Sequence, residues 1–218
     1  MSTVRHFFGM IALVLSCLAS PTQAQDALPD DSRNPNYFAL GAGLLVGSGF
    51  HDALVDAYSE DYNISGGGGF FDMQAGFGIS VDRHFYILPR LRLLGCPIAI
   101  KGYSGFPPSK DAAIILMPGV YGRYAVSEEM PSFYADAGIS LVSPSCDLNR
   151  ISCESGGLAL GAALGYAHGS HEFEISYTKI PIDLVDSEYD YDYGASSATK
   201  ETDWGGVSFT YRRRWTFD

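Results

Sequence analysis

Nine charged side chains stand at alternate positions within apolar segments of this 218-residue sequence and could pair with one another. In β-strands, alternate residues face the same side, and in a narrow closed barrel one such side is a lumen only just wide enough for side chains. Because buried charges must pair to offset the cost of leaving water, we predict an ion-pair network, with a conducting pore as the alternative. The charges are Asp72, Arg90, Arg92, Arg123, Asp136, Glu172, Glu174, Arg212 and Arg214.

A second group of residues has the types needed for covalent chemistry on lipids. His51 stands near Ser48 and Asp52 in the sequence. Together they would supply a base (His51), a nucleophile (Ser48) and an orienting acid (Asp52). They lie at the outer rim of the membrane barrel that the strand pattern described below predicts. This spacing is loose and commonplace in loops. We therefore expect no enzyme, and lipid modification is the alternative. The other candidate bases fall at the opposite rim: His84, His168 and His171.

The segment 183–193, DLVDSEYDYDY, is acidic and rich in tyrosine. Alternating carboxylates lie on one side of an extended chain. Calcium would suit them, but no binding loop of recognised spacing is present, so we expect no cofactor and predict a solvated hairpin extension. Interleaved tyrosines are frequent in recognition surfaces, which makes a host or cell-surface ligand the expected partner of this loop.

Two cysteines bracket a short polar loop. Cys146 and Cys153 flank the sequence DLNRIS. The N-terminus, described below, predicts export to an oxidising compartment, in which such cysteine pairs form disulfides. We predict a disulfide that pins this loop, with two free thiols as the alternative. Cys96, near the end of a predicted strand, is interpreted as a small buried residue.

The elements that must position these residues are clearest at the C-terminus. Residues 205–217, GGVSFTYRRRWTF, alternate in polarity, and the apolar face thickens into aromatics towards the end. A strand needs this pattern when its outer face crosses lipid and ends in an aromatic girdle. Arg213 shares the apolar parity, and we expect it to reach the headgroups by snorkelling. The terminal aromatic strand is marked by Phe209, Tyr211, Trp215 and Phe217.

Seven further alternating segments precede it, each near the ~9–11 residues that a tilted transmembrane strand requires. Pro89 and Pro118 fall inside two of them, where each removes a ladder hydrogen bond, so we expect either bulges or a shifted register there. The predicted segments are 37–47, 70–81, 84–94, 112–124, 133–142, 157–167 and 171–180.

The connections between these segments alternate in length. Residues 81–84, 127–131 and 168–170 are short, whereas 50–69, 97–111, 143–155 and 181–203 are long. The sequence therefore predicts an all-β fold, an eight-stranded antiparallel up-and-down transmembrane β-barrel with short periplasmic turns and long extracellular loops. A soluble lipocalin-like barrel, with its apolar face inside, is the alternative. Glycines on the charged face and aromatics at the strand ends favour the membrane barrel.

The N-terminus predicts export. Arg5 and His6 precede an apolar run, residues 7–19, and small residues lead to Ala24, as in a secretory signal peptide. We assign 1–24 to the cleaved signal, 25–36 to a periplasmic segment and 37–218 to the barrel. A retained anchor and lipidation of Cys17 are alternatives. The formal net charge of -11 argues against nucleic acid as a partner, because domains that bind it are basic.

With this strand pattern and the ending TYRRRWTF, the chain resembles the small eight-stranded outer-membrane barrels. These are the outer-membrane protein A transmembrane domain, the Ail/Lom-like adhesins and the opacity-type surface proteins. The resemblance implies a monomer in the bacterial outer membrane that contacts its lipids and is inserted by the barrel-insertion machinery. We expect a structural or surface-interaction role, in adhesion or envelope integrity. A lipid-modifying enzyme, a small porin-like pore and a periplasmic ligand carrier are the alternatives.

Overall fold

The computed structural model describes residues 36–52, 63–66, 69–101, 109–127, 131–148, 151–154, 156–188 and 196–217. The predicted signal peptide, Cys17, most of the predicted periplasmic segment and the tip 189–195 of the acidic loop lie outside the described residues. Within the described part of the chain, no helix is long and apolar enough to cross a membrane.

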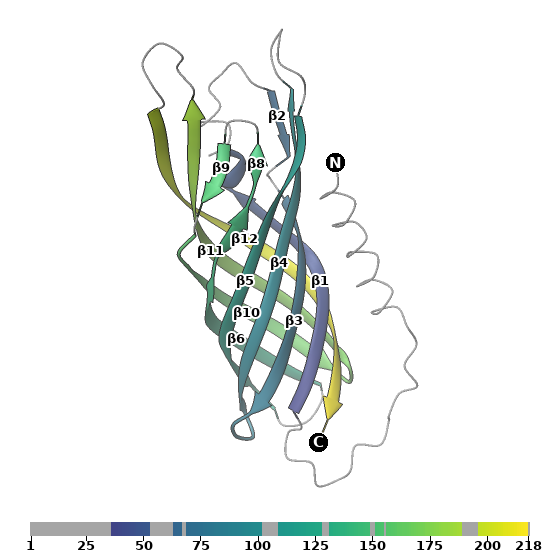
Figure 1. Ribbon diagram of the computed structural model, residues 1–218. Coiled ribbons are helices and arrows are strands. Elements are labelled where there is room, and N and C mark those ends of the chain that lie inside the picture. Colours follow the sequence, from purple (N-terminus) through teal and green to yellow (C-terminus); the bar gives the residue numbers. More distant parts are fainter. Residues whose placement is uncertain are drawn as a thin grey trace.

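Eight long strands form one closed barrel (Figure 1). Each pairs antiparallel with the next in chain order, and the pairing of the last with the first closes the ring, with Phe38 opposite Trp215. The predicted fold class is confirmed. The eight strands are β1 (Asn36–Ser48), β3 (Gly69–Ser80), β4 (Phe85–Lys101), β5 (Ser109–Ala125), β6 (Ser132–Leu141), β10 (Leu158–His168), β11 (His171–Glu188) and β12 (Ser196–Phe217).

Four shorter strands lengthen the wall at the end with the long connections (Figure 1). β2 pairs with β4, β7 with β5, and β9 with both β8 and β11. They lie within segments that we predicted as loops. Their bounds are β2 (Asn63–Gly66), β7 (Ser143–Ser145), β8 (Asp147–Leu148) and β9 (Ile151–Glu154).

The main strands also run further at this end than predicted. β4 and β5 stay paired as far as Ile100 and Ser109, and β11 and β12 as far as Glu188 and Ser196. The predicted starts of the loops 97–111 and 181–203 were therefore wrong. Beyond the membrane neither face of a strand must be apolar, so the alternation fades while backbone pairing continues.

Tight turns close the opposite, periplasmic end. In the β3–β4 turn, the Oδ1 atom of Asp82 accepts the backbone N–H groups of His84 and Phe85, both at 2.7 Å. The β10–β11 turn contains Gly169 with φ +58°, a conformation that glycine adopts without strain. Short turns at one rim and long hairpins at the other are as predicted for this fold.

Both prolines sit at gaps in a ladder. The β3–β4 ladder is interrupted beside Pro89, and the ladder of β5 with β6 and β7 is interrupted beside Pro118. The residue pairs that flank each gap are three positions apart on both strands, so the register is the same on either side of the gap. The expectation of a bulge or a shifted register was wrong, because these strands tolerate a missing N–H simply by leaving the ladder open.

The barrel is apolar outside and charged inside. Leu164 and Phe133 on the outer face are 70% and 65% exposed, whereas Asp72 and Glu172 on the inner face are 0% exposed. A soluble barrel would have the reverse arrangement, since monomeric soluble proteins rarely expose large continuous apolar patches. This surface is that of a barrel surrounded by lipid.

Candidate functional site

The nine charged residues that the sequence predicted to face the lumen do point inward. We call them the charged lumen cluster. Eight are buried, and only Arg214, nearest the periplasmic rim, is partly exposed. They come from strands all around the ring, so their contacts cross the lumen as well as follow the wall.

Asp72 and Arg92 form the contact nearest the middle of the barrel. The Nε atom of Arg92 lies 2.9 Å from Oδ1 of Asp72, and its Nη2 lies 2.5 Å from Oδ2. Asp72 also accepts hydrogen bonds from Ser208 at 2.5 Å and from Gln74 at 3.2 Å. Arg92 donates to the Thr178 hydroxyl at 2.6 Å. This one ion pair thereby connects β3, β4, β11 and β12.

Asp136 and Glu174 each accept hydrogen bonds from two arginines on different strands. Arg90 reaches Asp136 at 2.7 Å, and Arg123 meets both oxygens of the same carboxylate at 2.8 and 2.9 Å. Glu174 contacts Arg212 and, at 3.4 Å, Arg90. Two-point contacts between arginine and carboxylate are among the strongest hydrogen bonds in proteins.

Glu172 lies closer to the periplasmic end and is surrounded by three cations. Its nearest contacts are Arg123 at 2.8 Å and Arg212 at 3.1 Å, with Arg214 at 3.7 Å. The cluster therefore shares charges among several partners rather than forming separate pairs. Sequence alone could not assign these partners.

The charged lumen cluster contains five arginines but only four carboxylates. Inward-facing tyrosines supply further contacts to the arginines. The aromatic face attracts a cation, and two of the hydroxyls accept hydrogen bonds, Tyr37 from Arg123 at 2.9 Å and Tyr134 from Arg212 at 2.8 Å. The predicted network did not include these tyrosines, although Tyr121 and Tyr134 share the parity of the charges on their strands. The stacked pairs are Arg123 over Tyr134 at 3.6 Å, Arg90 over Tyr121 at 4.6 Å and Arg214 over Tyr37 at 4.9 Å.

Little space remains at this level of the lumen. A cavity of about 10 Å³ lies beside Tyr37, Gln74 and Glu172, which is room for about one water molecule. The side chains of the charged lumen cluster, apart from Arg214, and of its tyrosines are buried here.

Nearer the extracellular end, the inward face changes from charged to apolar. Its centre is a trio of rings: Phe70 stacks on Trp204 at 4.9 Å, and Phe50 contacts both at 5.3 and 5.4 Å. We did not predict this core, although apolar residues at inward positions such as Leu45 and Ile180 signal it. The apolar lumen cluster comprises Leu45, Phe50, Phe70, Leu94, Cys96, Ile98, Ala113, Ile115, Met117, Val142, Cys146, Ala159, Ile180, Ile182 and Trp204.

Two of the candidate catalytic residues, His51 and Asp52, follow Phe50 of this core directly in the chain. After Gly49, whose φ is +108°, residues 50–52 adopt a helical conformation that leaves Phe50 buried, His51 partly buried and Asp52 exposed. The Ser48 side chain lies outside the described residues. At the opposite rim, the His84 ring contacts the Ala125 carbonyl at 3.0 Å. No three His, Cys, Asp or Glu side chains among the described residues gather as a metal site would require.

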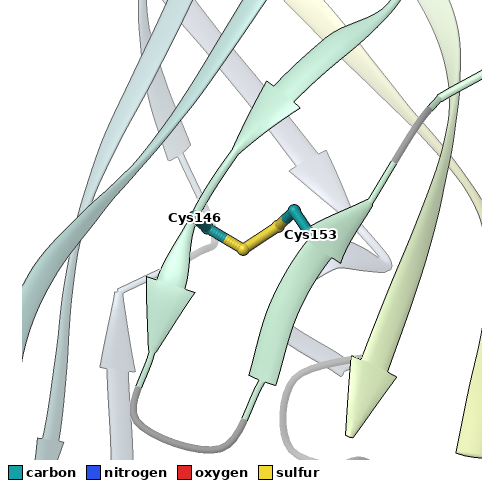
Figure 2. Close-up of a disulfide and its surroundings, with 2 residues drawn as sticks. All are labelled: Cys146 and Cys153. Atoms are coloured by element: carbon teal, nitrogen blue, oxygen red, sulfur yellow. A yellow bond between two sulfur atoms is a disulfide. The ribbon is translucent and has the colours of Figure 1, made fainter.

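Cys146 and Cys153 lie side by side at the edge of the apolar lumen cluster (Figure 2). Their Cα atoms are 5.1 Å apart and their sulfur atoms are bonded. β8 and β9 form the hairpin between them, and β9 also pairs with β11, with Cys153 opposite Leu184. The bond therefore links this hairpin to the barrel core. Cys96 is buried, as the sequence indicated.

The terminal aromatic strand presents its rings to the outside. Phe209 and Phe217 are exposed, and Trp215 stacks on Phe38 across the barrel closure at 5.8 Å. Tyr211 hydrogen-bonds to the His171 ring at 2.6 Å. Arg213 lies on this face and is largely covered, with its guanidinium 5.8 Å from the Trp215 ring centre. Its contact with headgroups stays a prediction.

The fold is that of small outer-membrane β-barrels. No protein-family model matches the sequence, and a comparison with curated proteins found no similar sequence. Among solved structures, the chain is similar to the outer membrane protein OprG from Pseudomonas aeruginosa, with a TM-score of 0.54, 8% identity, and coverage of 84% of this chain and 97% of OprG. It is also similar to the outer membrane protein AlkL, determined in DMPC bilayers, with a TM-score of 0.51, 14% identity, and coverage of 90% and 98%.

At these identities the likeness concerns the fold alone. Together with the apolar outer face, it identifies an outer-membrane β-barrel protein, as predicted. The more specific resemblance to the protein A domain, the Ail/Lom-like adhesins and the opacity-type proteins stays a prediction.

Proposed function

We propose that this barrel is a non-conducting, non-enzymatic anchor that presents a fixed extracellular hairpin to a cell-surface partner. The observation that carries the proposal is the continuous ladder of β11 and β12 as far as Glu188 opposite Ser196, with β9 paired on its flank. A three-stranded extension of the wall is a defined surface rather than a loose loop, which lowers the ordering cost of binding.

The charge of this extension indicates the kind of partner. Residues 183–203 contain seven acidic residues and a single basic one, Lys200, together with three tyrosines at the tip. Electrostatic complementarity favours a partner with a basic surface, and tyrosine supplies contact area at little entropic cost. The filled cross-section beside the charged lumen cluster supports an anchor rather than a pore.

Deletion of residues 187–196 tests the proposal. We expect cells that display the shortened protein to adhere less well, or to survive serum less well, than cells with the full chain. Raised salt should weaken adhesion of the full chain, because the attraction is electrostatic. A matched deletion of residues 102–108, between β4 and β5 in the sequence, should have the smaller effect. Equal adhesion of both deletion variants and the full chain would contradict the proposal.

Two further measurements address the other functions. Planar-bilayer recordings should give no large, steady conductance, and its presence would favour a pore. Mass spectrometry of lipid A should be the same for the full chain and for His51→Ala. A change in lipid A caused by this substitution would identify a lipid-modifying enzyme instead.

A further inference from the structure

One arginine of the barrel wall lies on the lipid-facing side. The five other arginines of the described strands belong to the charged lumen cluster, whereas Arg213 shares its side of β12 with the exposed Phe209 and Phe217. An arginine on this face destabilises a barrel most at the middle of the bilayer and least near the interfaces. Arg213 lies four residues before Phe217, at the periplasmic end of β12 (Figure 1). It therefore stands near the level at which phospholipid headgroups begin.

Aromatic rings flank Arg213 on this face. The ring centre of Trp215, two residues nearer the periplasmic rim, is 5.8 Å from the guanidinium carbon, and Trp215 stacks on Phe38. On the other side, the rings of His171 and Tyr211 are stacked with centres 5.8 Å apart. The indole face attracts a cation, which brings the guanidinium towards the rim. Because Arg213 is only 8% exposed, its side chain is held against the wall and has little freedom left to lose on binding a ligand.

His171 provides a second hydrogen-bond donor beside Arg213. The two residues are directly opposite each other on β11 and β12, and side chains in such positions have Cβ atoms about 4.5–5.5 Å apart. The Nδ1 atom of His171 lies 2.6 Å from the Tyr211 hydroxyl oxygen. When this hydroxyl donates to Nδ1, the ring hydrogen is on Nε2, which is then a donor. His171 is exposed, so this donor is accessible from the headgroup region.

These donors suit a phosphate group. A guanidinium is a planar fork that binds two phosphate oxygens at once, and the imidazole N–H adds a further donor. Tryptophan and tyrosine are the side chains enriched at headgroup level, and Trp215 and Tyr211 both flank Arg213. The molecules that carry phosphate at this level are the phospholipids of the periplasmic leaflet, whose negative charge complements the arginine. We propose that Arg213 and His171 together bind the phosphate group of one such phospholipid.

Solid-state NMR of the protein in phosphatidylglycerol vesicles tests the proposal. The side-chain nitrogens of arginine and histidine are isotope-labelled, and their signals are dephased by lipid phosphorus only when the two nuclei are a few ångströms apart. We expect one dephased arginine signal that is lost in Arg213→Lys, and one dephased histidine signal that is lost in His171→Phe. The arginines of the charged lumen cluster should not be dephased, because they face away from the lipid.

Two controls sharpen this test. The matched variant is Arg83→Lys, in the exposed turn between β3 and β4 at the same rim, and it should leave the dephased arginine signal unchanged. Both lysine variants keep the charge, so a difference between them reports the position of the arginine. The second control separates a lipid from a free anion. In dodecyl maltoside, which contains no phosphorus, added inorganic phosphate should cause no dephasing.

Three outcomes would overturn the proposal. The first is the absence of dephasing at the nitrogens of either Arg213 or His171 in protein shown to be folded by heat-modifiable migration. The second is an equal loss of the dephased signal in Arg83→Lys and Arg213→Lys. The third is dephasing by inorganic phosphate in detergent, which would assign the site to a free anion. If Arg213→Lys does not fold, Arg213→Gln replaces it. None of these readouts depends on adhesion, so they stand apart from the proposed function.

Discussion

The charged lumen cluster and the apolar lumen cluster fill two halves of one barrel in opposite ways. Both use inward-facing residues of the same strands: Arg92 and Leu94 are separated by one residue on β4. In the charged half each contact joins particular atoms, as between Arg90 and Asp136. In the apolar half the stabilisation is nondirectional. Inward parity therefore decides where a side chain points, whereas its contact partners decide how freely it can be replaced.

The two halves also face different tasks. The charged half lies towards the periplasmic turns and connects strands from opposite sides of the ring through its ion pairs. The apolar half supports the extracellular extension through Cys146 and Cys153. Adaptable packing thus lies on the side of the molecule where the surface contacts are proposed.

The largest expected loss of stability follows from a substitution in the charged half. Asp136→Asn keeps the shape of the side chain but removes the charge that Arg90 and Arg123 share. Removing one partner of a buried ion pair costs about 3–5 kcal/mol, so the free energy of unfolding in lipid vesicles should fall by roughly that amount. Urea titration followed by tryptophan fluorescence measures it.

The control for this substitution is an exposed carboxylate. Asp52→Asn, in the helical turn after β1, removes the same charge from a side chain in solvent. Its effect should stay within about 0.5 kcal/mol, as for most surface substitutions. If the two substitutions have equal effects, the charged lumen cluster does not stabilise the barrel through its ion pairs.

The next effect concerns the disulfide at the edge of the apolar half. Cys146 and Cys153 are seven residues apart, and so short a ring contributes at most about 2–3 kcal/mol by chain entropy. Replacing both by serine should therefore leave a folded barrel and make the β8–β9 hairpin sensitive to protease. Mass spectrometry of peptides from this loop, before and after reduction, checks the bond. Alkylatable thiols at both positions in protein taken from the envelope would contradict it.

A smaller effect is expected for a shape-conserving change in the apolar half. Leu94 is fully buried, and Leu94→Met keeps volume and polarity, which usually costs less than about 1.5 kcal/mol. The same urea titration compares it with Asp136→Asn. A loss for Leu94→Met as large as that for Asp136→Asn would remove the distinction between the two halves.

Much of this arrangement could be predicted from the sequence, because lipid imposes a strict alternation on strands that cross it. That alternation placed Asp72, Glu172 and the other charges on the inner face. It could not assign their partners, since Arg90 meets Glu174 from 84 positions away, a contact that depends on strand tilt and closure.

The smallest expected loss of stability follows from a substitution in the solvent-exposed periplasmic turn between β3 and β4, beside the charged half. Backbone N–H groups of His84 and Phe85 donate to Asp82 and hold the pKa of that carboxyl below its usual range. Because the pKa is lower in the folded than in the unfolded protein, the ionised carboxylate stabilises the fold above the unfolded pKa, and this stabilisation is lost as pH falls through the folded pKa. Asp82→Ala should therefore lower the temperature of the heat-modifiable gel shift slightly at neutral pH, and the difference from the unmodified chain should vanish in acid. A difference independent of pH would mean that this turn, unlike the charged lumen cluster, owes nothing to its carboxylate charge.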